Sequence, residues 1–577
     1  MKNLVKTLFP YTHYVLIAVA LLFAQAICDL TLPDYMSDIV NTGVIDSNIP
    51  YIWQMGGKMV LVSLASAVAS ILVGYIAAYI AANVAGDLRS GVFKKVESFS
   101  NAQFDRFSTA SLITRTTNDV TQVQTLLVMA IRFIFYAPIM GIGGVIHAVQ
   151  KSASMTWIIA IAVICLIGLI SLLLVLVMPK FMSIQNFLDR INRVARENLD
   201  GMLVIRAFNT QRFEEKRFDK ANADFAGTNL YVNRAMSVMM PAMMLIMNLT
   251  TVAIVWIGAV QVTSFNMDIG DMMAYMQYAM QIIMAFLFLA MMFIMVPRAI
   301  VSSDRIHEVL ETEPSIVDPE APKSFPEPFN GEVRFEDVSF RYPGSEDDVL
   351  KHVSFTARPG TTTAFIGATG SGKSTVMNLL MRFYDVTGGR VTVGGRDVRE
   401  VSQHDLRAKI GYVPQKSLLF SGTIKSNLAY SDENMPLENV ERAARISQAS
   451  EFIDEKPERY DEAIAQGGTN VSGGQKQRLS IGRAVAKNAP IYVFDDSFSA
   501  LDLKTDARLR EALGREISGA TLLIVAQRVS TVMNADQIVV LENGAVAGIG
   551  THRSLLASCP VYHEIAASQL SEEELFK

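Results

Sequence analysis

The sequence predicts two structures in one chain: an all-α domain of six membrane-spanning helices, followed by an α/β domain with a phosphate loop. Of the 577 residues, 50% are hydrophobic and only 19% are charged, and the mean hydropathy is +0.28, which is apolar for a soluble protein. The apolar residues gather in six blocks before Pro297. After residue 331, short β-rich runs alternate with helical ones, as in a parallel sheet with crossover helices.

The six apolar blocks mostly reach the roughly 20 residues that cross a bilayer as a helix. They lie near residues 14–33, 59–85, 122–148, 156–178, 239–263 and 272–297. Lys and Arg are scarce in the short joins at 41–50, 150–155 and 264–271, but abundant in the long joins at 86–121 and 179–234. Because positive residues stay on the cytoplasmic side, we expect the N-terminus, both long joins and the following domain in the cytoplasm.

The two long joins are polar but helical in pattern, with few Gly or Pro. We therefore expect the membrane helices to continue into the cytoplasm, rising about 1.5 Å per residue. Turns are expected at 99–109 and 206–218. Ordinary loops are the alternative, which their length without turn residues disfavours.

The composition changes after Pro297. Residues 311–331, "ETEPSIVDPEAPKSFPEPFNG", are rich in Pro and acidic residues and cannot form the interior of a helix. The sequence therefore predicts a membrane domain at 1–310, a linker at 311–330 and a nucleotide-binding domain at 331–577.

The stretch "GATGSGKST" fits the phosphate-loop pattern, because a strand precedes it and a helix follows it. Its residues are Gly367, Ala368, Thr369, Gly370, Ser371, Gly372, Lys373, Ser374 and Thr375. The glycines let backbone N–H groups face phosphates at the positive end of the helix. We expect Lys373 to neutralise phosphate charge and Ser374 to bind Mg²⁺. Asp495, which ends the apolar strand "IYVFD", is the expected second partner of that Mg²⁺.

A second anion-binding nest is expected at "VSGGQKQR", residues 471–478, where Ser-Gly-Gly precedes a helix. One domain does not need two phosphate nests for one nucleotide. Two such domains arranged head to tail would each use the other's second nest.

With these motifs in this order, the whole chain resembles the ATP-binding cassette (ABC) transporters, and its membrane half resembles the six-helix (type IV) exporters. The resemblance implies ATP and Mg²⁺ as cofactors, with Tyr342 stacking on adenine and Gln415 touching Mg²⁺. It also implies a multi-pass protein of the bacterial plasma membrane. The signature motif would be Ser472, Gly473, Gly474 and Gln475, and the D-loop would be Ser499–Asp502. Residues 104–120 and 198–209 resemble the stretches beside the family's two coupling helices.

Two residues depart from the family pattern. Asp496 stands where the family has the glutamate that holds the attacking water, and Gln527 stands where it has a histidine. The Asp carboxylate falls on the order of 1 Å short, and such a misplacement can cost about 100-fold in rate. Gln527 can donate a hydrogen bond but cannot share a proton. Both changes affect the ATP held by this chain's own phosphate loop.

The signature motif, in contrast, differs from the family's usual form only by Val471 in place of Leu. The chain has thus lost what catalyses at its own site and kept what it lends to a partner. This favours the degenerate half of a heterodimeric exporter, paired with a second half-transporter. The competing hypotheses are a homodimer that tolerates Asp496, a siderophore-type importer of the same build, and an ATP-gated channel or regulatory subunit.

The membrane half favours a hydrophobic or amphipathic substrate, because methionines suit surfaces that adapt to apolar ligands. They crowd the fifth and sixth spans at Met236, Met239, Met240, Met243, Met244, Met247, Met272, Met273, Met276, Met280 and Met284. Asp29 and Arg132 lie within spans, where they either pair with each other or contact substrate. The net charge of −5 argues against a nucleic-acid partner. No cleavable signal peptide is expected, and Cys28, Cys165 and Cys559 show no metal spacing.

Overall fold

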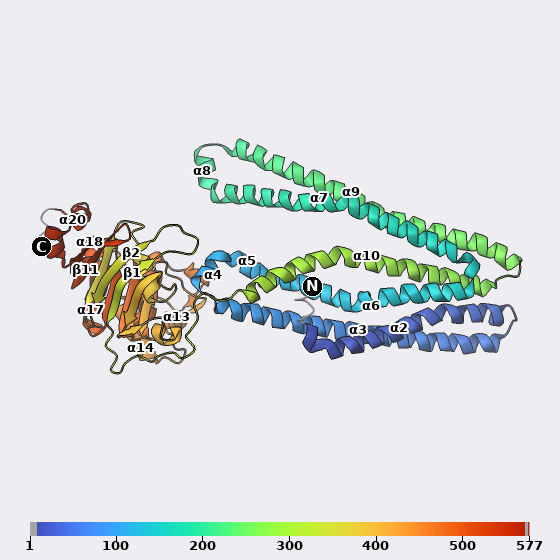
Figure 1. The fold of residues 1–577 in the computed structure, drawn as a ribbon, viewed down its shortest axis with the longest axis horizontal. Coiled ribbons are helices and arrows are strands. Elements are labelled where there is room, and N and C mark those ends of the chain that lie inside the picture. Colours follow the sequence, from blue (N-terminus) through green and yellow to red (C-terminus); the bar gives the residue numbers. More distant parts are fainter. Residues whose placement is uncertain (1–7, 572–574, 576–577) are drawn as a thin grey trace. The chain divides into compact units, whose positions relative to one another are not determined.

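The computed structural model describes residues 8–571 and residue 575, and it divides into two compact units. The first unit comprises Met1–Glu97 and Thr109–Thr312, and the second comprises Ser98–Ser108 and Glu313–Lys577. The first unit contains long helices, and the second contains sheets with shorter helices (Figure 1).

In the described part of the first unit, all regular secondary structure is helical. Its long helices are α2 (Thr12–Asp38), α3 (Ile49–Glu97), α6 (Val120–Lys151), α7 (Thr156–Asp200), α9 (Gln211–Thr263) and α10 (Ile269–Glu311). Its short elements are η1 (Phe9–Tyr11), η2 (Ile39–Val44), α5 (Thr109–Thr114), η3 (Arg115–Asp119), η4 (Ala153–Met155) and α8 (Met202–Ala207). Among the described residues, six helical segments are long and apolar enough to cross a membrane, which confirms the six predicted spans. The longest helix, α9, has 53 residues and a length of about 80 Å, which exceeds the roughly 30 Å thickness of a bilayer core.

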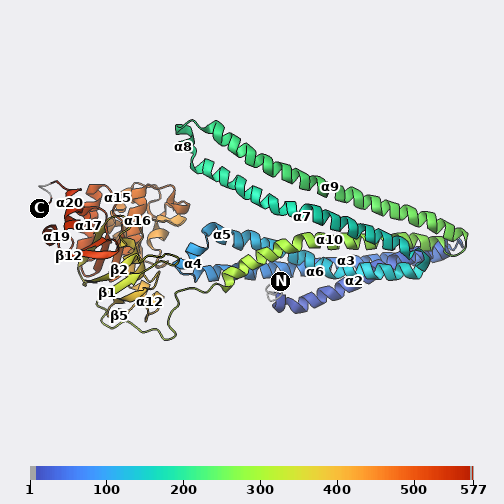
Figure 2. The ribbon, with the colours of Figure 1, turned by 45° about the horizontal axis from the view of Figure 1, so that its top comes forward.

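The long helices pack in pairs, with α10 against α6, α2 against α3, and α7 against α9. Both ribbon views show α7 and α9 running together as a hairpin that diverges from the other helices toward α8 (Figures 1 and 2). None of the residues of α8 is buried, and the Leu203 side chain at this tip is 82% exposed.

The turns between long helices agree with the sequence in one place and differ in the other. α3 ends at Glu97, a short helix α4 (Asn101–Arg106) follows, and α5 begins at Thr109, as the predicted turn at 99–109 requires. The second turn is shorter than the stretch in which it was predicted. The chain bends at Gly201 and at 208–210, the latter within the predicted break at 206–218, and α9 already begins at Gln211. Residues 211–218 are polar, but they carry the helix-supporting pair Glu214–Arg217, three residues apart at 3.3 Å.

The second unit contains a mixed six-stranded sheet in the order β12-β11-β3-β10-β9-β6 and a four-stranded antiparallel sheet in the order β2-β1-β4-β5, besides the small pair β7-β8. The strands are β1 (Val333–Phe340), β2 (Leu350–Ala357), β3 (Thr362–Gly367), β4 (Gly388–Val393), β5 (Arg396–Asp397), β6 (Ile410–Val413), β7 (Gly422–Thr423), β8 (Ala463–Ile464), β9 (Ile491–Asp495), β10 (Thr521–Val525), β11 (Gln537–Glu542) and β12 (Ala545–Gly550). All neighbours in the six-stranded sheet are parallel except β11 and β12. This α/β unit confirms the predicted fold class.

Helices cover the sheets of this unit. They are α11 (Lys373–Leu380), α12 (Gln403–Ala408), α13 (Ile424–Leu428), α14 (Leu437–Ile446), α15 (Ser450–Asp454), η5 (Arg459–Asp461), η6 (Gln466–Gly468), α16 (Gly473–Ala486), α17 (Leu503–Glu516), α18 (Val529–Val532), α19 (His552–Ser558) and α20 (Pro560–Ala567). Every residue of β9 and β10 is buried, which explains why these strands read as continuous apolar runs. Parallel pairing aligns Val525 with both Asp495 and Phe365, so the ends of β3, β9 and β10 meet at one edge. Ligands of open α/β sheets bind at this edge.

The structure assigns α4 to the second unit, although the sequence placed it within a continuous membrane domain. Ala102 packs against the core of the second unit, and the Tyr384 hydroxyl donates a hydrogen bond of 2.9 Å to Asp105. Between the end of α10 at Glu311 and the start of β1 at Val333, the chain has no regular secondary structure. The sequence predicted the linker in this stretch.

Candidate nucleotide-binding site

The phosphate loop connects β3 to α11, and its backbone requires glycine. Gly372 caps α11 with a φ of 97°, and a Cβ added there would lie 2.5 Å from Leu350 Cδ2. Gly370 has a φ of 85°, a conformation that other residues rarely adopt. The fold therefore brings together all nine residues predicted for the loop, at the carboxyl end of a buried strand.

Lys373 bends back over the loop. Its Nζ donates to the carbonyl oxygens of Gly367 and Ala368, each at 2.8 Å. Burial lowers the pKa of Lys373, while the negative charges of Asp496 and Asp495 oppose that shift. A buried ammonium group whose hydrogen-bond partners are neutral carbonyl oxygens is well suited to bind an anion.

Ser371 supplies an independent indication that the loop fits a phosphate. Its side chain is 4% exposed, and its Oγ has no hydrogen-bond partner among the described residues. A buried polar atom without a partner costs free energy, so such atoms usually have one. A phosphate oxygen within the loop would provide it.

The structure brings together Ser374 and Asp495, the two residues expected at Mg²⁺, and Ser374 Oγ donates a hydrogen bond to Asp495 Oδ1 at 2.9 Å. Burial raises the pKa of Asp495, and the hydrogen bond from Ser374 opposes that shift. Hydroxyl and carboxylate oxygens suit Mg²⁺, which commonly takes one or two carboxylates plus phosphate oxygens. No group of three or more His, Cys, Asp or Glu side chains that could hold a metal occurs in the described part of the chain.

The structure also brings together Gln415, Asp496 and Gln527. Oδ2 of Asp496 accepts a hydrogen bond from Gln527 Nε2 at 2.8 Å and a long one from Gln415 Nε2 at 3.5 Å. Burial raises the pKa of Asp496, and the hydrogen bond from Gln415, the charge of Lys373 and the hydrogen bond from Gln527 oppose that shift. Asp496 has a φ of 49°, the left-handed region, and Ser499 Oγ donates to its carbonyl oxygen at 3.0 Å.

Tyr342 lies beside the phosphate loop. Its hydroxyl is 3.0 Å from Thr375 Oγ1, and its ring packs edge-on against Phe340 and Tyr384, with centroids 4.8 and 5.1 Å away. The Tyr342 ring, which is expected to stack on adenine, is thus already held in place beside the phosphate loop.

The signature residues form the N-terminus of α16. Ser472 Oγ accepts a hydrogen bond from the Gln475 backbone N–H at 3.3 Å, and the Gln475 side chain accepts one from the Ser472 N–H at 3.0 Å. Ser472 and Gly473 are exposed, and within the described part of the chain no hydrogen bond joins them to the phosphate loop. The predicted D-loop ends in Asp502, which caps α17 by accepting from Thr505 N at 2.9 Å.

One residue that contacts this site had no signal in the sequence. The Gln569 side chain donates to the Gln527 carbonyl at 3.0 Å and accepts from the Val529 N–H at 2.8 Å. It thus holds the backbone on both sides of Arg528. Gln569 lies 42 residues from Gln527, in a segment without a recognisable motif.

The two charged residues predicted within the spans do not pair directly. The Asp29 carboxylate accepts hydrogen bonds from Ser66 and Tyr136, both at 2.6 Å. Arg132 is exposed and reaches Ser70 Oγ at 3.4 Å, and no ion pair with Asp29 is found among the described residues.

Comparisons with known proteins agree with this geometry. Residues 15–286 match the family model "ABC transporter transmembrane region", and residues 350–499 match the model "ABC transporter". An uncharacterised ABC transporter ATP-binding protein of Mycobacterium tuberculosis, MT1311, is 40% identical, over 97% of this chain and 96% of its own length. YfiB of Bacillus subtilis, another uncharacterised ABC transporter ATP-binding protein, is 38% identical over 99% of both chains.

Two further comparisons concern a named activity and a solved fold. An ATP-dependent lipid A-core flippase of Aromatoleum aromaticum is 33% identical, over 84% of this chain and 80% of its own. The solved structure of a bacterial Atm1-family ABC exporter with ATP bound matches with a TM-score of 0.79 and 24% identity, over 97% of this chain and 99% of its own. With one membrane region and one ATPase domain in a single multi-pass chain, the protein is a half-transporter that belongs to the ABC transporter family.

Proposed function

We propose that the chain is one half of an ATP-driven heterodimeric exporter and that it hydrolyses the ATP at its own phosphate loop slowly. The carrying observation is the 2.8 Å hydrogen bond from Gln527 to Asp496 Oδ2. A carboxylate acting as base must place an oxygen within hydrogen-bond reach of the attacking water. Here the carboxylate is one methylene shorter than the family's glutamate, and the side chain that donates to it is an amide, which cannot carry a proton between groups.

The other residues of the site are suited to bind ATP and Mg²⁺. In this proposal Lys373, Ser371 and the loop N–H groups hold the phosphates, and Tyr342 stacks on adenine. Ser374 and Asp495 hold Mg²⁺, with Gln415 at its edge. When bound, Mg²⁺ neutralises charge that develops on the phosphates. ATP that is bound tightly and hydrolysed slowly would hold the two nucleotide-binding domains of a dimer together.

The exposed signature residues support a partner. Ser472 and Gly473 are presented at a helix N-terminus, where N–H groups and the helix dipole favour an anion. A Cβ on Gly473 would meet nothing within 4 Å in this chain, so a neighbouring molecule can approach. We propose that Ser472, Gly473, Gly474 and Gln475 bind ATP held by the partner's phosphate loop.

We propose a hydrophobic or amphipathic substrate, moved from the cytoplasmic side of a bacterial plasma membrane. Met240, Met244, Met280 and Met284 are each more than 40% exposed on α9 and α10, and their flexible side chains adapt to varied apolar shapes. A relative named as a lipid flippase supports an amphipathic lipid-like compound.

A homodimer is the second candidate, because Asp496 still supplies a carboxylate at the site. An ATP-gated channel or regulatory subunit and a siderophore-type importer are the competing functions that the experiment must separate. The test is phosphate release by the purified chain in nanodiscs, alone and co-purified with a candidate sister half. Fast turnover by the chain alone would refute the degenerate site, whereas turnover that requires the sister half supports the heterodimer. ATP-dependent accumulation of a fluorescent amphiphile in inside-out vesicles separates an exporter from a channel, regulator or importer.

A further inference from the structure

Residues 527 and 528 form a short exposed bridge between two fixed points of the second unit. The backbone N–H of Ala526, at the end of β10, donates to Phe365 O at 3.1 Å. α18 begins at Val529, whose side chain is fully buried. Between these points Gln527 and Arg528 are exposed, so packing in the core does not set the directions of their side chains.

Both side chains of this bridge reach the nucleotide site. Gln527 Nε2 donates to Asp496 Oδ2 at 2.8 Å. Arg528 Nη2 donates to the carbonyl oxygen of Ser499, the first residue of the predicted D-loop, at 3.1 Å. Because both side chains start from an exposed backbone, these two hydrogen bonds depend on whatever fixes that backbone.

One amide group fixes the backbone of the bridge. Gln569 Nε2 donates to Gln527 O at 3.0 Å, and Gln569 Oε1 accepts from the Val529 N–H at 2.8 Å. The first N–H groups of a helix lack partners within the helix, and Arg528, the N-cap of α18, makes no side-chain capping hydrogen bond. Gln569 thus supplies the cap. An amide can donate and accept at the same time, whereas a carboxylate only accepts.

The segment that carries Gln569 is itself anchored in the core. Gln569 follows α20, and its backbone N–H donates to Ala566 O at 3.1 Å. Tyr562 and Ala566 of α20 are fully buried in the hydrophobic cluster that also contains Val529. Leu575, farther along the chain, belongs to the same cluster. The Gln569 amide is therefore held by buried residues on both sides of it in the sequence.

We propose that Gln569 is a positioning residue of the ATP site, which holds Gln527 in place toward the terminal phosphate. Asp496 stands at the position expected beside the water that attacks this phosphate, and Gln527 donates to Asp496. Gln527 therefore lies where ATP differs from ADP, and Gln569 strengthens the binding of ATP relative to ADP. The proposal rests on the part of the proposed function in which this phosphate loop binds ATP, but not on slow hydrolysis or on a second subunit.

The experiment measures how fast two nucleotides leave the full-length protein in nanodiscs. The probes are the fluorescent non-hydrolysable analogue MANT-AMP-PNP and MANT-ADP, each with Mg²⁺. In Gln569→Ala we expect release of the analogue to accelerate about 5-fold, the typical net contribution of one hydrogen bond, while release of MANT-ADP stays unchanged. Hydrolysis does not enter the readout, so this test can succeed or fail independently of the slow-site proposal.

Gln569→Glu separates positioning from stability. An ionised carboxylate of the same length still accepts from the Val529 N–H, but it cannot donate to Gln527 O. Because the cap of α18 is kept, Tm should stay at the unmodified value, whereas release of MANT-AMP-PNP should accelerate as in Gln569→Ala. Release of the analogue at the unmodified rate in Gln569→Glu would overturn the proposal.

The effect of Gln569 must also pass through Gln527. In a Gln527→Ala background, Gln569→Ala should cause no further acceleration, because substitutions of residues that act through one another are not additive. The same additional acceleration in that background, or equal acceleration for both nucleotides, would show a merely structural role and would overturn the proposal.

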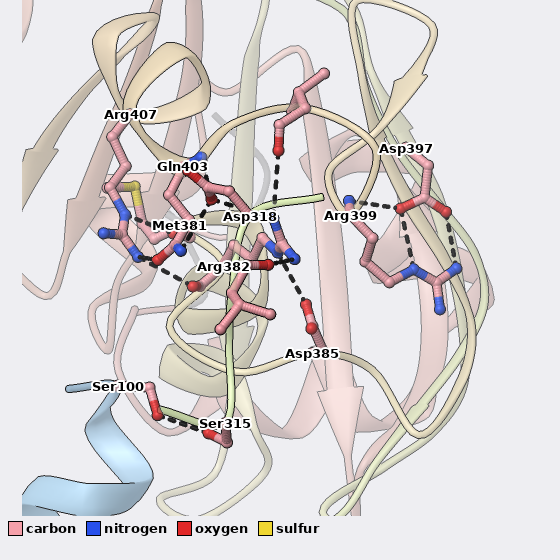
Figure 3. A network of polar contacts seen from close by, with 12 residues as sticks. Ser100, Ser315, Asp318, Met381, Arg382, Asp385, Asp397, Arg399, Gln403 and Arg407 are labelled. Carbon is pink, nitrogen blue, oxygen red and sulfur yellow. Dashed lines mark hydrogen bonds and ion pairs between the residues drawn. The ribbon is translucent and has the colours of Figure 1, made fainter. Parts of the chain in front are cut away.

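The matched control is Gln403→Ala, because Gln403 also uses both halves of its amide. Its Nε2 donates to Asp318 Oδ1 at 3.0 Å, and its Oε1 accepts from Arg407 Nη2 at 3.0 Å. Figure 3 shows this glutamine in a polar network around Arg382, and none of the residues labelled there belongs to the predicted nucleotide site. We expect both nucleotides to leave Gln403→Ala at the unmodified rates. Faster release of the analogue alone in this control would contradict a role specific to Gln569.

Discussion

Restoring the two family residues should accelerate hydrolysis at the site that we propose to be slow. In Asp496→Glu with Gln527→His, the added methylene advances the carboxylate by on the order of 1 Å, and the imidazole can share a proton. The 2.8 Å amide–carboxylate hydrogen bond is removed at the same time. A correctly placed base contributes roughly 10²–10⁴-fold, so we expect at least about 100-fold faster hydrolysis, or about 2.7 kcal/mol of barrier.

ATP binding should change little in this double variant, because Lys373, Ser374 and the glycine loop are untouched. The assay is single-turnover phosphate release at the chain's own site, with the partner's phosphate-loop lysine substituted so that only this site turns over. The lifetime of trapped nucleotide is measured in parallel. With both sites active, faster hydrolysis here should lower the amount of substrate transported per ATP, because in the proposed function a slowly hydrolysed ATP holds the two ATP-binding domains together.

Each single variant is a control. Asp496→Glu alone keeps the Gln527 amide beside the carboxylate, and Gln527→His alone keeps the shorter carboxylate of Asp496. We expect both to gain less than the double variant. An unchanged nucleotide lifetime in the double variant would refute the view that these two side chains make the site slow. An increase in transport per ATP would refute a role for slow hydrolysis in coupling.

Three further predictions concern the same unit. In the assembled transporter, Gly474→Asp should abolish most ATP turnover while Asp496→Asn changes it little, and the reverse result would invert the assignment of sites. Gly372→Ala should abolish binding of a fluorescent ATP analogue and lower Tm, because a Cβ would lie 2.5 Å from Leu350 Cδ2 at a φ of 97°; binding within 2-fold of the unmodified protein would contradict this. Gln569→Ala should shorten the lifetime of trapped ATP several-fold without weakening ADP binding, since it frees only the backbone around residue 527; equal loss of both nucleotides would indicate general destabilisation instead.

The sequence by itself determined the fold class, and it predicted the set of binding residues. Six spans follow from the length of apolar runs, because a bilayer core demands about 20 apolar residues per helix. The phosphate loop follows from nine consecutive residues between a strand and a helix. Such features depend on neighbours a few positions away, so a linear pattern is enough to predict them.

Tertiary structure alone decided how those residues meet. The sheet order brings β9 and β10 side by side, and only this places Gln527 within 2.8 Å of Asp496 across 31 positions of sequence. The tertiary structure also assigns α4 to the second unit. The hydrogen bond between Tyr384 and Asp105 joins residues that are 279 positions apart in the sequence. No local periodicity encodes such contacts, because they arise only when separate elements pack on a common core.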